Sequence, residues 1–303
     1  MRDERQPPAI GIALRDPYPW DVLASLTRAA EERGYRALFL PEIGGRDTLA
    51  AVTGLAGETQ SILMGPGVAP LGSRTPQLLA MAVATAQERS GGRLLLGLGT
   101  GPAGPGALER LRATVIGLHE VFVSGVGTVE GERIALGLVP AAPPPLWIAA
   151  LGPRAARLAG EVADGVLLNW CTPERVARAC AEVAARAEGV GRDPAEITVA
   201  VYLRVALGSA REHALAAAAE YASYPAYARQ FAQMGLDPGD PGSLVDAVCL
   251  TGEPQQARER LGAYRHAGAE LPVVYPVAAP GDRGSPGAAQ LVLRTLEIFA
   301  PSP

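Results

Sequence analysis

The sequence contains no lysine: all 27 of its basic residues are arginine. A chain without lysine cannot form a Schiff base with a carbonyl substrate through its own side chains, so this type of covalent catalysis is excluded. Cysteine and histidine are scarce, and neither forms a closely spaced pair: Cys171, Cys180, Cys249, His119, His213 and His266. We therefore expect reduced thiols in a cytoplasmic protein and no metal site.

Long apolar runs and an excess of positive charge are also missing. No run of apolar residues reaches the length of a transmembrane helix, and the first eight residues lack the core of a signal peptide. The net charge of -4 makes nucleic acid and anionic membranes poor partners. With 303 residues, 48% of them apolar, the chain can bury a large core, and we expect a single domain over residues 1–303.

Glycine and proline are abundant and are spread along the chain, with 36 and 27 copies. This distribution indicates many tight turns. Between the turns, short apolar runs alternate with segments of helical periodicity, as in a parallel α/β sheet. Strands are predicted at 10–14, 37–40, 62–65, 94–98, 146–149, 166–168, 197–207 and 272–277. Helices are predicted at 20–33, 46–59, 76–90, 106–123, 173–188, 209–221, 253–266 and 286–299, with a further helix beginning at Pro153.

This pattern gives a closed barrel of eight strand–helix units or an open doubly wound sheet, and it leaves both open. Three segments interrupt the alternation. Residues 124–145 are predicted to form a short hairpin and a linker. Residues 222–245, with several prolines, are a candidate insertion, and 246–250 a short strand.

The stretch from Pro145 to Trp170 reads as strand, tight turn, helix and strand. Gly152 ends the first strand, and Pro153 suits the first turn of a helix. The turn then places free backbone N–H groups at the carboxyl end of a parallel strand, a geometry that binds phosphate. The alternative is an ordinary strand–helix turn without a ligand.

The same stretch resembles a known family. The segments 149–154, 158–161 and 163–169 are similar to those of luciferase-like oxidoreductases, most closely the branch that uses the deazaflavin coenzyme F420, such as methylenetetrahydromethanopterin reductase. Further matches in the same order lie at 34–42, 45–47, 65–68, 74–76, 92–93, 96–101 and 252–254. The resemblance implies an α/β TIM (β/α)8 barrel with insertions and a homodimer. It also implies that the cofactor phosphate lies on the turn formed by Ala150, Leu151, Gly152, Pro153 and Arg154, which Asn169 supports.

The resemblance implies further site residues. Glu42 corresponds to an acidic residue near the deazaflavin, which makes it a candidate proton donor, with helix capping as the alternative. Ile43 stands where some members have a histidine. Gly67, Val68 and Ala69 correspond to a bulge behind the cofactor ring, with a cis peptide bond between Gly67 and Val68. An ordinary trans turn is the alternative there.

Other candidates come from their places after predicted strands. Residues 99–104 match a GxGxxG pattern, but two prolines remove N–H groups, so a tight turn is favoured over a dinucleotide site. The family resemblance implies that this loop, with Thr100, borders the cofactor. Trp170 can wall a flat ring or pack in the core. Tyr18 and Trp20 are candidate substrate contacts. Cys171 is expected to be a small apolar filler, and Arg46-Asp47 a structural helix start.

These observations lead to one expected function and two alternatives. We expect an oxidoreductase that transfers hydride between F420 and a small organic substrate, by reduction of a C=C or C=N bond. A monooxygenase that uses reduced FMN is one alternative, because the two cofactors share a ring shape and a phosphate. A protein that binds such a cofactor without turnover is the other.

Overall fold

The structure, a computed structural model, describes residues 9–15, 17–101 and 104–301. The chain forms two compact units. Unit 1 comprises Met1–Ala37, Leu168–Ala181 and Val199–Pro303, and unit 2 comprises Leu38–Leu167 and Glu182–Thr198. The boundaries between them fall inside continuous secondary-structure elements, so the chain passes from one unit to the other without a linker.

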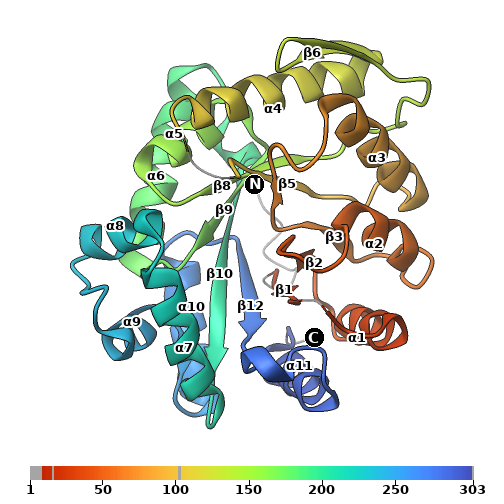
Figure 1. The fold of residues 1–303 in the computed structure, drawn as a ribbon. Helices are drawn as coiled ribbons and strands as arrows, with labels where there is room; N and C mark the ends of the chain where they lie inside the picture. The colour runs from red at the N-terminus through yellow and green to blue at the C-terminus, as the bar shows by residue number, and fades with distance from the viewer. Residues whose placement is uncertain (1–8, 16, 102–103, 302–303) are drawn as a thin grey trace. The chain divides into compact units, whose positions relative to one another are not determined.

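Unit 2 contains parallel strands that alternate with helices (Figure 1). Its elements are β2 (Ala37–Leu40), α2 (Thr48–Leu55), β3 (Leu63–Pro66), β4 (Ala69–Pro70), α3 (Pro76–Arg89), β5 (Leu96–Gly99), α4 (Ala107–Ser124), β6 (Val126–Val129), β7 (Glu132–Ala135), β8 (Leu146–Ala150), α5 (Pro153–Val162) and the first part of β9 (Gly165–Asn169). Strand β5 pairs in parallel with β4 and with β8. The hairpin predicted within 124–145 is confirmed, because β6 and β7 pair antiparallel.

Several glycines allow close backbone packing within unit 2. A Cβ atom on Gly65 of β3 would lie 1.7 Å from the carbonyl oxygen of Leu95. A Cβ atom on Gly117 of α4 would lie 2.1 Å from the carbonyl oxygen of Thr128 in β6, and Figure 1 shows that strand along the helix. At both positions, only a residue without a side chain permits the approach.

Unit 1 holds the remaining strands and most of the C-terminal helices (Figure 1). Its elements are β1 (Gly11–Ala13), α1 (Trp20–Glu32), the start of α6 (Pro173–Gly189), β10 (Thr198–Ala206), α7 (Ala210–Ala222), α8 (Pro225–Gln233), α9 (Pro241–Val248), β11 (Leu250–Thr251), α10 (Pro254–His266), β12 (Leu271–Pro276) and α11 (Pro286–Phe299). Strand β12 pairs in parallel with β1 and with β10, and β10 also pairs with β11.

The strand predicted at 246–250 is wrong. Helix α9 extends through Val248, and only Leu250–Thr251 forms a strand. The helix begins at Pro241, and the carboxylate of Asp240 accepts a hydrogen bond from the Ser243 N–H, a favourable N-cap. Residues 222–245 therefore carry two helices, α8 and α9, before β11; their assignment as an insertion and the single-domain organisation stay predictions.

The described residues contain no helix that is both long enough and apolar enough to cross a membrane. Helix α2 begins at Thr48, not at residue 46, because Asp47 is its N-cap and accepts a hydrogen bond from the Ala50 N–H at 3.0 Å. The expectation that Arg46-Asp47 marks a structural helix start is thereby confirmed for Asp47.

Candidate functional site

The strand–turn–helix predicted from Pro145 onward is present in unit 2. Strand β8 ends at Ala150, Gly152 is the N-cap of α5 in an extended conformation, and Pro153 is the first helical residue. No side chain caps this helix. The N–H groups of Ala155 and Ala156 both donate to the carbonyl oxygen of Gly152, each at 3.1 Å.

The start of α5 is open to a ligand. A Cβ atom on Gly152 would meet no atom of the described chain within 4 Å, and the Arg154 side chain is exposed. Proline has no N–H, so Pro153 can shape the turn but cannot donate a hydrogen bond to a phosphate. The remaining backbone donors of the turn are those of Leu151, Gly152 and Arg154. Combined with the partial positive charge of the helix N-terminus, they suit an anionic group.

The peptide bond between Gly67 and Val68 is cis, as predicted. The Val68 side chain lies against two glycines of β5: a Cβ atom on Gly97 would be 3.2 Å from its Cγ1, and one on Gly99 would be 2.6 Å from its Cγ2. Ala69 is buried and pairs with Leu98 of β5. Val68 itself is half-buried, so part of its surface stays accessible.

Thr100 directly follows β5. Its hydroxyl donates to the Gly101 carbonyl oxygen at 3.2 Å, and Arg110 donates to the Thr100 carbonyl oxygen at 3.3 Å. Within the GxGxxG pattern, Pro102 and Ala103 lie outside the described residues.

Glu42 is engaged on both carboxylate oxygens. Arg74 donates one hydrogen bond to each, at 2.5 and 2.8 Å, and the Thr48 N–H donates to Oε1 at 3.0 Å. Arg74 also pairs with Asp47 at 2.5 Å, and the hydrogen bonds to Glu42 are the main reason that the pKa of Arg74 lies above its ordinary value. Since the Glu42 carboxylate acts only as an acceptor here, the geometry favours the helix-capping alternative over proton donation.

Replacing Glu42 tests this assignment. We expect Glu42→Gln to lower the free energy of unfolding by about 1–3 kcal/mol, because one charge of a largely buried pair is lost while Arg74 keeps Asp47. Denaturant unfolding measures the loss, and Asp193→Asn at an exposed turn is the comparison. Turnover by the folded variant is expected to persist; its disappearance at unchanged stability would restore the proton-donor role.

Asn169 and Trp170 lie at the end of β9 in unit 1, and both side chains have protein partners. The Asn169 amide accepts a hydrogen bond from Arg204 and donates one to the Tyr227 hydroxyl at 2.9 Å. Trp170 is 1% exposed and packs in a core cluster with Phe231 and Leu244. Core packing, one of the two alternatives, therefore describes Trp170. The Asn169 amide holds Arg204, and its support of the α5 turn stays a prediction.

Two side chains from distant parts of the sequence hold the backbone of the turn formed by Asn169, Trp170 and Cys171. Trp170 has a φ of 53°, unusual for a bulky residue. Gln230 of α8 donates from Nε2 to the carbonyl oxygens of Asn169 and Trp170, at 2.8 and 2.7 Å. The Tyr264 hydroxyl of α10 donates to the Cys171 carbonyl oxygen at 2.8 Å. Burial raises the pKa of the Cys171 thiol to about 11, so it is an inert filler, as expected.

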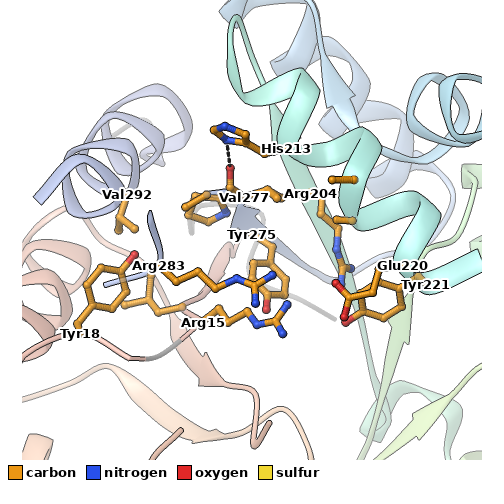
Figure 2. Close-up of a pocket in the computed structure, with 15 residues that line it drawn as sticks. Arg15, Tyr18, Arg204, His213, Glu220, Tyr221, Tyr275, Val277, Arg283 and Val292 are labelled. Carbon is orange, nitrogen blue, oxygen red and sulfur yellow. Dashed lines mark hydrogen bonds between the residues drawn. The ribbon is translucent and has the colours of Figure 1, made fainter. Parts of the chain in front are cut away.

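A pocket of about 670 Å³, including the solvent at its mouth, lies within unit 1 (Figure 2). Residues that follow β1, Arg204 within β10 and residues at and after the end of β12 line it, as do residues of α7 and α11. Tyr18, 5% exposed, is one of them, in agreement with its expected place in a pocket. Trp20 is 40% exposed on α1 and does not line this pocket, so its expected substrate contact has no support here.

Sequence reasoning did not identify Arg204, which also lines the pocket. The sequence did contain a signal for this residue, because Arg204 is the one charged residue within the apolar strand β10, whose other residues are mostly buried. In the part of the chain that the structure describes, no three His, Cys, Asp or Glu side chains are grouped as metal ligands.

Comparisons with known proteins agree with this architecture. The model of the family described as luciferase-like monooxygenase matches residues 7–271. The chain is 31% identical over 194 residues to 5,10-methylenetetrahydromethanopterin reductase of Methanolobus tindarius, covering 59% of this chain and 60% of the reductase. It is 31% identical over 239 residues to F420-dependent hydroxymycolic acid dehydrogenase of Mycobacterium tuberculosis, covering 69% of this chain and 65% of the dehydrogenase. The matched region thus spans less than two thirds of either relative.

Among solved structures, the coenzyme F420-dependent tetrahydromethanopterin reductase from Methanopyrus kandleri matches with a TM-score of 0.76 and 21% identity, over 98% of this chain and 99% of the other. This similarity confirms the predicted TIM-barrel fold and excludes the open doubly wound sheet. The family match covers most of the sequence and agrees with the resemblance found from its motifs. The chain therefore belongs to the luciferase-like monooxygenase family.

Proposed function

We propose that the protein is an oxidoreductase that transfers hydride between coenzyme F420 and a small organic substrate, by reduction of a C=C or C=N bond. The observation that carries this proposal is the uncapped start of α5, with open space at Gly152, in a sequence whose relatives include F420-dependent enzymes. The residues fit such a cofactor because the turn offers backbone donors and Arg154 to a phosphate, without a competing side-chain cap.

The proposed cofactor contacts lie in unit 2. Leu151, Gly152 and Arg154 hold the phosphate, with Ala150 and Pro153 shaping the turn. The accessible surface of Val68 supports the ring, and Gly97 and Gly99 leave room for its methyl groups. Further contacts are proposed from Gly67, Ala69 and Thr100.

When bound, the deazaflavin supplies the carbon that accepts or gives the hydride. The contribution of this chain is to orient and to shield. A half-buried valine backed by glycines presents an apolar surface that excludes water from one side of a flat group. Glu42 contributes by fixing Arg74 and the start of α2. Tyr18 contacts the substrate in the pocket of unit 1, a role that its burial there supports.

Titration of the purified protein with F420 and with FMN tests the cofactor assignment. We expect quenching of F420 fluorescence with a dissociation constant in the micromolar range or below, and at least tenfold weaker binding of FMN. Tight FMN binding without F420 binding would contradict the proposal and support a monooxygenase that uses reduced FMN, as the family description allows. Binding without turnover across a panel of enones and imines would support a non-catalytic binding protein.

The assembly and location are proposed with the same function. We propose a cytoplasmic homodimer. Sedimentation that shows a monomer at micromolar concentration would contradict the dimer.

A further inference from the structure

Arg204 is a buried cation with no acidic partner among the described residues. It is 4% exposed on β10 and lines the pocket of unit 1. Its guanidinium lies over three aromatic rings, 4.4 Å from the centroid of Trp170, 4.7 Å from Tyr275 and 5.1 Å from Tyr221. Arg204 takes part in none of the ion pairs formed among the described residues. Buried arginines are rarely left in this state, because an unpaired charge is costly to desolvate.

The aromatic rings compensate only part of this cost. The guanidinium carbon lies over the rings, which attract the cation but are not hydrogen-bond acceptors for its in-plane N–H groups. A guanidinium has five N–H donors, and the hydrogen bond given to a protein acceptor goes from Nη1 to the Asn169 amide oxygen. Donors in the plane are therefore left for a ligand. A carboxylate or phosphate that enters edge-on accepts two parallel hydrogen bonds from such a group.

Two further arginines line the same pocket. Arg15 follows β1, Arg283 precedes α11, and both are half-buried. Figure 2 shows both guanidinium groups reaching toward Tyr275. Both arginines lower the pKa of the Tyr275 phenol, although burial, the larger effect, raises it to about 12. The charges of Arg15 and Arg283 are therefore both felt at the Tyr275 hydroxyl group in this pocket.

The pocket holds little opposing charge. Glu220 is its acidic lining residue among those described; it is exposed and accepts a hydrogen bond from the Tyr224 hydroxyl at 3.4 Å. No ion pair within 4.0 Å joins it to any of the three arginines in the described part of the chain. His213 contacts the Val277 carbonyl oxygen at 3.3 Å. Among the described lining residues, three arginines thus face one carboxylate, in a chain whose net charge is -4.

We propose that this pocket binds the oxyanion group of a small organic substrate, a carboxylate or a phosphate, with Arg204 as its principal ligand. Arg15 and Arg283 add positive potential, and Leu14, Val292 and other apolar lining residues contact the body of the molecule. The inference rests on the proposed function only in naming the occupant as the substrate. The anion site itself follows from the buried, unpaired guanidinium.

Calorimetric titration of the cofactor-free protein with inorganic phosphate and with propionate tests the site. The Gly152→Asp variant serves as the background, because it keeps phosphate from the α5 turn. We expect Arg204→Met to weaken binding of the preferred anion at least tenfold. Arg229→Met, which removes an exposed arginine of α8 outside the pocket, should leave the affinity unchanged. The tighter of the two probes identifies phosphate or carboxylate as the recognised group.

Equal anion affinity in the Arg204→Met and Arg229→Met variants would overturn the proposal. Should Arg204→Met fail to fold, Arg283→Met decides: a loss of anion affinity of threefold or more supports the site, and no loss overturns it.

F420 titration of the same variants in the unmodified background separates the two proposals. Anion binding that depends on Arg204, without any F420 binding, would sink the proposed function alone. A loss of F420 affinity parallel to that of the anion would assign the pocket to the cofactor and overturn the substrate assignment.

Discussion

Gly152→Asp is expected to weaken F420 binding about a hundredfold, a cost of roughly 3 kcal/mol. Gly152 is the N-cap of α5, and the space where a side chain would extend is open. An aspartate placed there puts a negative charge where the phosphate is proposed to lie. Its carboxylate also accepts from the first N–H groups of the helix, the donors that the phosphate needs.

The same substitution has an opposite effect on stability, which makes the test sharp. Aspartate is a better N-cap than glycine, by a few tenths of a kcal/mol, and the extended backbone at Gly152, with φ of -112°, accommodates it. We therefore expect an equal or slightly higher melting temperature together with the loss of cofactor affinity. Fluorescence titration measures the affinity, and Gly152→Asn, similar in size but uncharged, should lose much less. Unchanged affinity in folded Gly152→Asp would refute the phosphate assignment.

Gly65→Ala is expected to prevent folding or to destabilise the protein by more than about 4 kcal/mol. The new Cβ atom would lie 1.7 Å from the Leu95 carbonyl oxygen and 2.8 Å from its carbonyl carbon, and neither atom belongs to a flexible side chain. The Leu95 N–H in turn donates to the Met64 carbonyl oxygen at 2.9 Å, so relief of the clash requires separation of hydrogen-bonded backbone.

Gly262→Ala provides the matched control. Gly262 lies inside α10, and a Cβ atom there would meet nothing within 4 Å. Alanine in a helix interior is favoured over glycine by roughly 0.5–1 kcal/mol, so this variant should be as stable as the parent or more stable. Soluble yield and denaturant unfolding compare the two. A Gly65→Ala protein that unfolds within 1 kcal/mol of the parent would contradict the packing described for β3.

The sequence predicted those elements whose ends are marked by local chemistry. The bounds of β2 and α11 agree with the structure, because proline or glycine stands beside an apolar run of clear periodicity. The strand expected at 246–250 failed for a related reason. Pro225 and Pro241 lie in the segment taken as a candidate insertion, and both occupy the first position of a helix, where proline is favourable.

The same distinction separates the parts of the candidate site that the sequence predicted from those that it did not. The α5 turn was visible because its proposed role depends on backbone N–H groups arranged by neighbouring residues. The surroundings of Arg204 were not, since its partners Asn169, Trp170 and Tyr275 are brought to β10 only by the fold. Glu42 shows what a resemblance alone leaves out. The resemblance indicated an acidic residue near the cofactor, but only the structure shows that Glu42 pairs with Arg74, 32 residues away.

The hydrogen bonds from Gln230 to the carbonyl oxygens of Asn169 and Trp170 connect α8 to the residues that pack around Arg204. Four of the nine residues of α8 are exposed, whereas Gln230 and Phe231 are buried. A small displacement of this helix would move the Trp170 ring and the Asn169 amide, and with them the guanidinium that they hold. For the proposed anion site, we therefore expect a directed-evolution library confined to residues 225–233 to alter ligand selectivity through the position of Arg204.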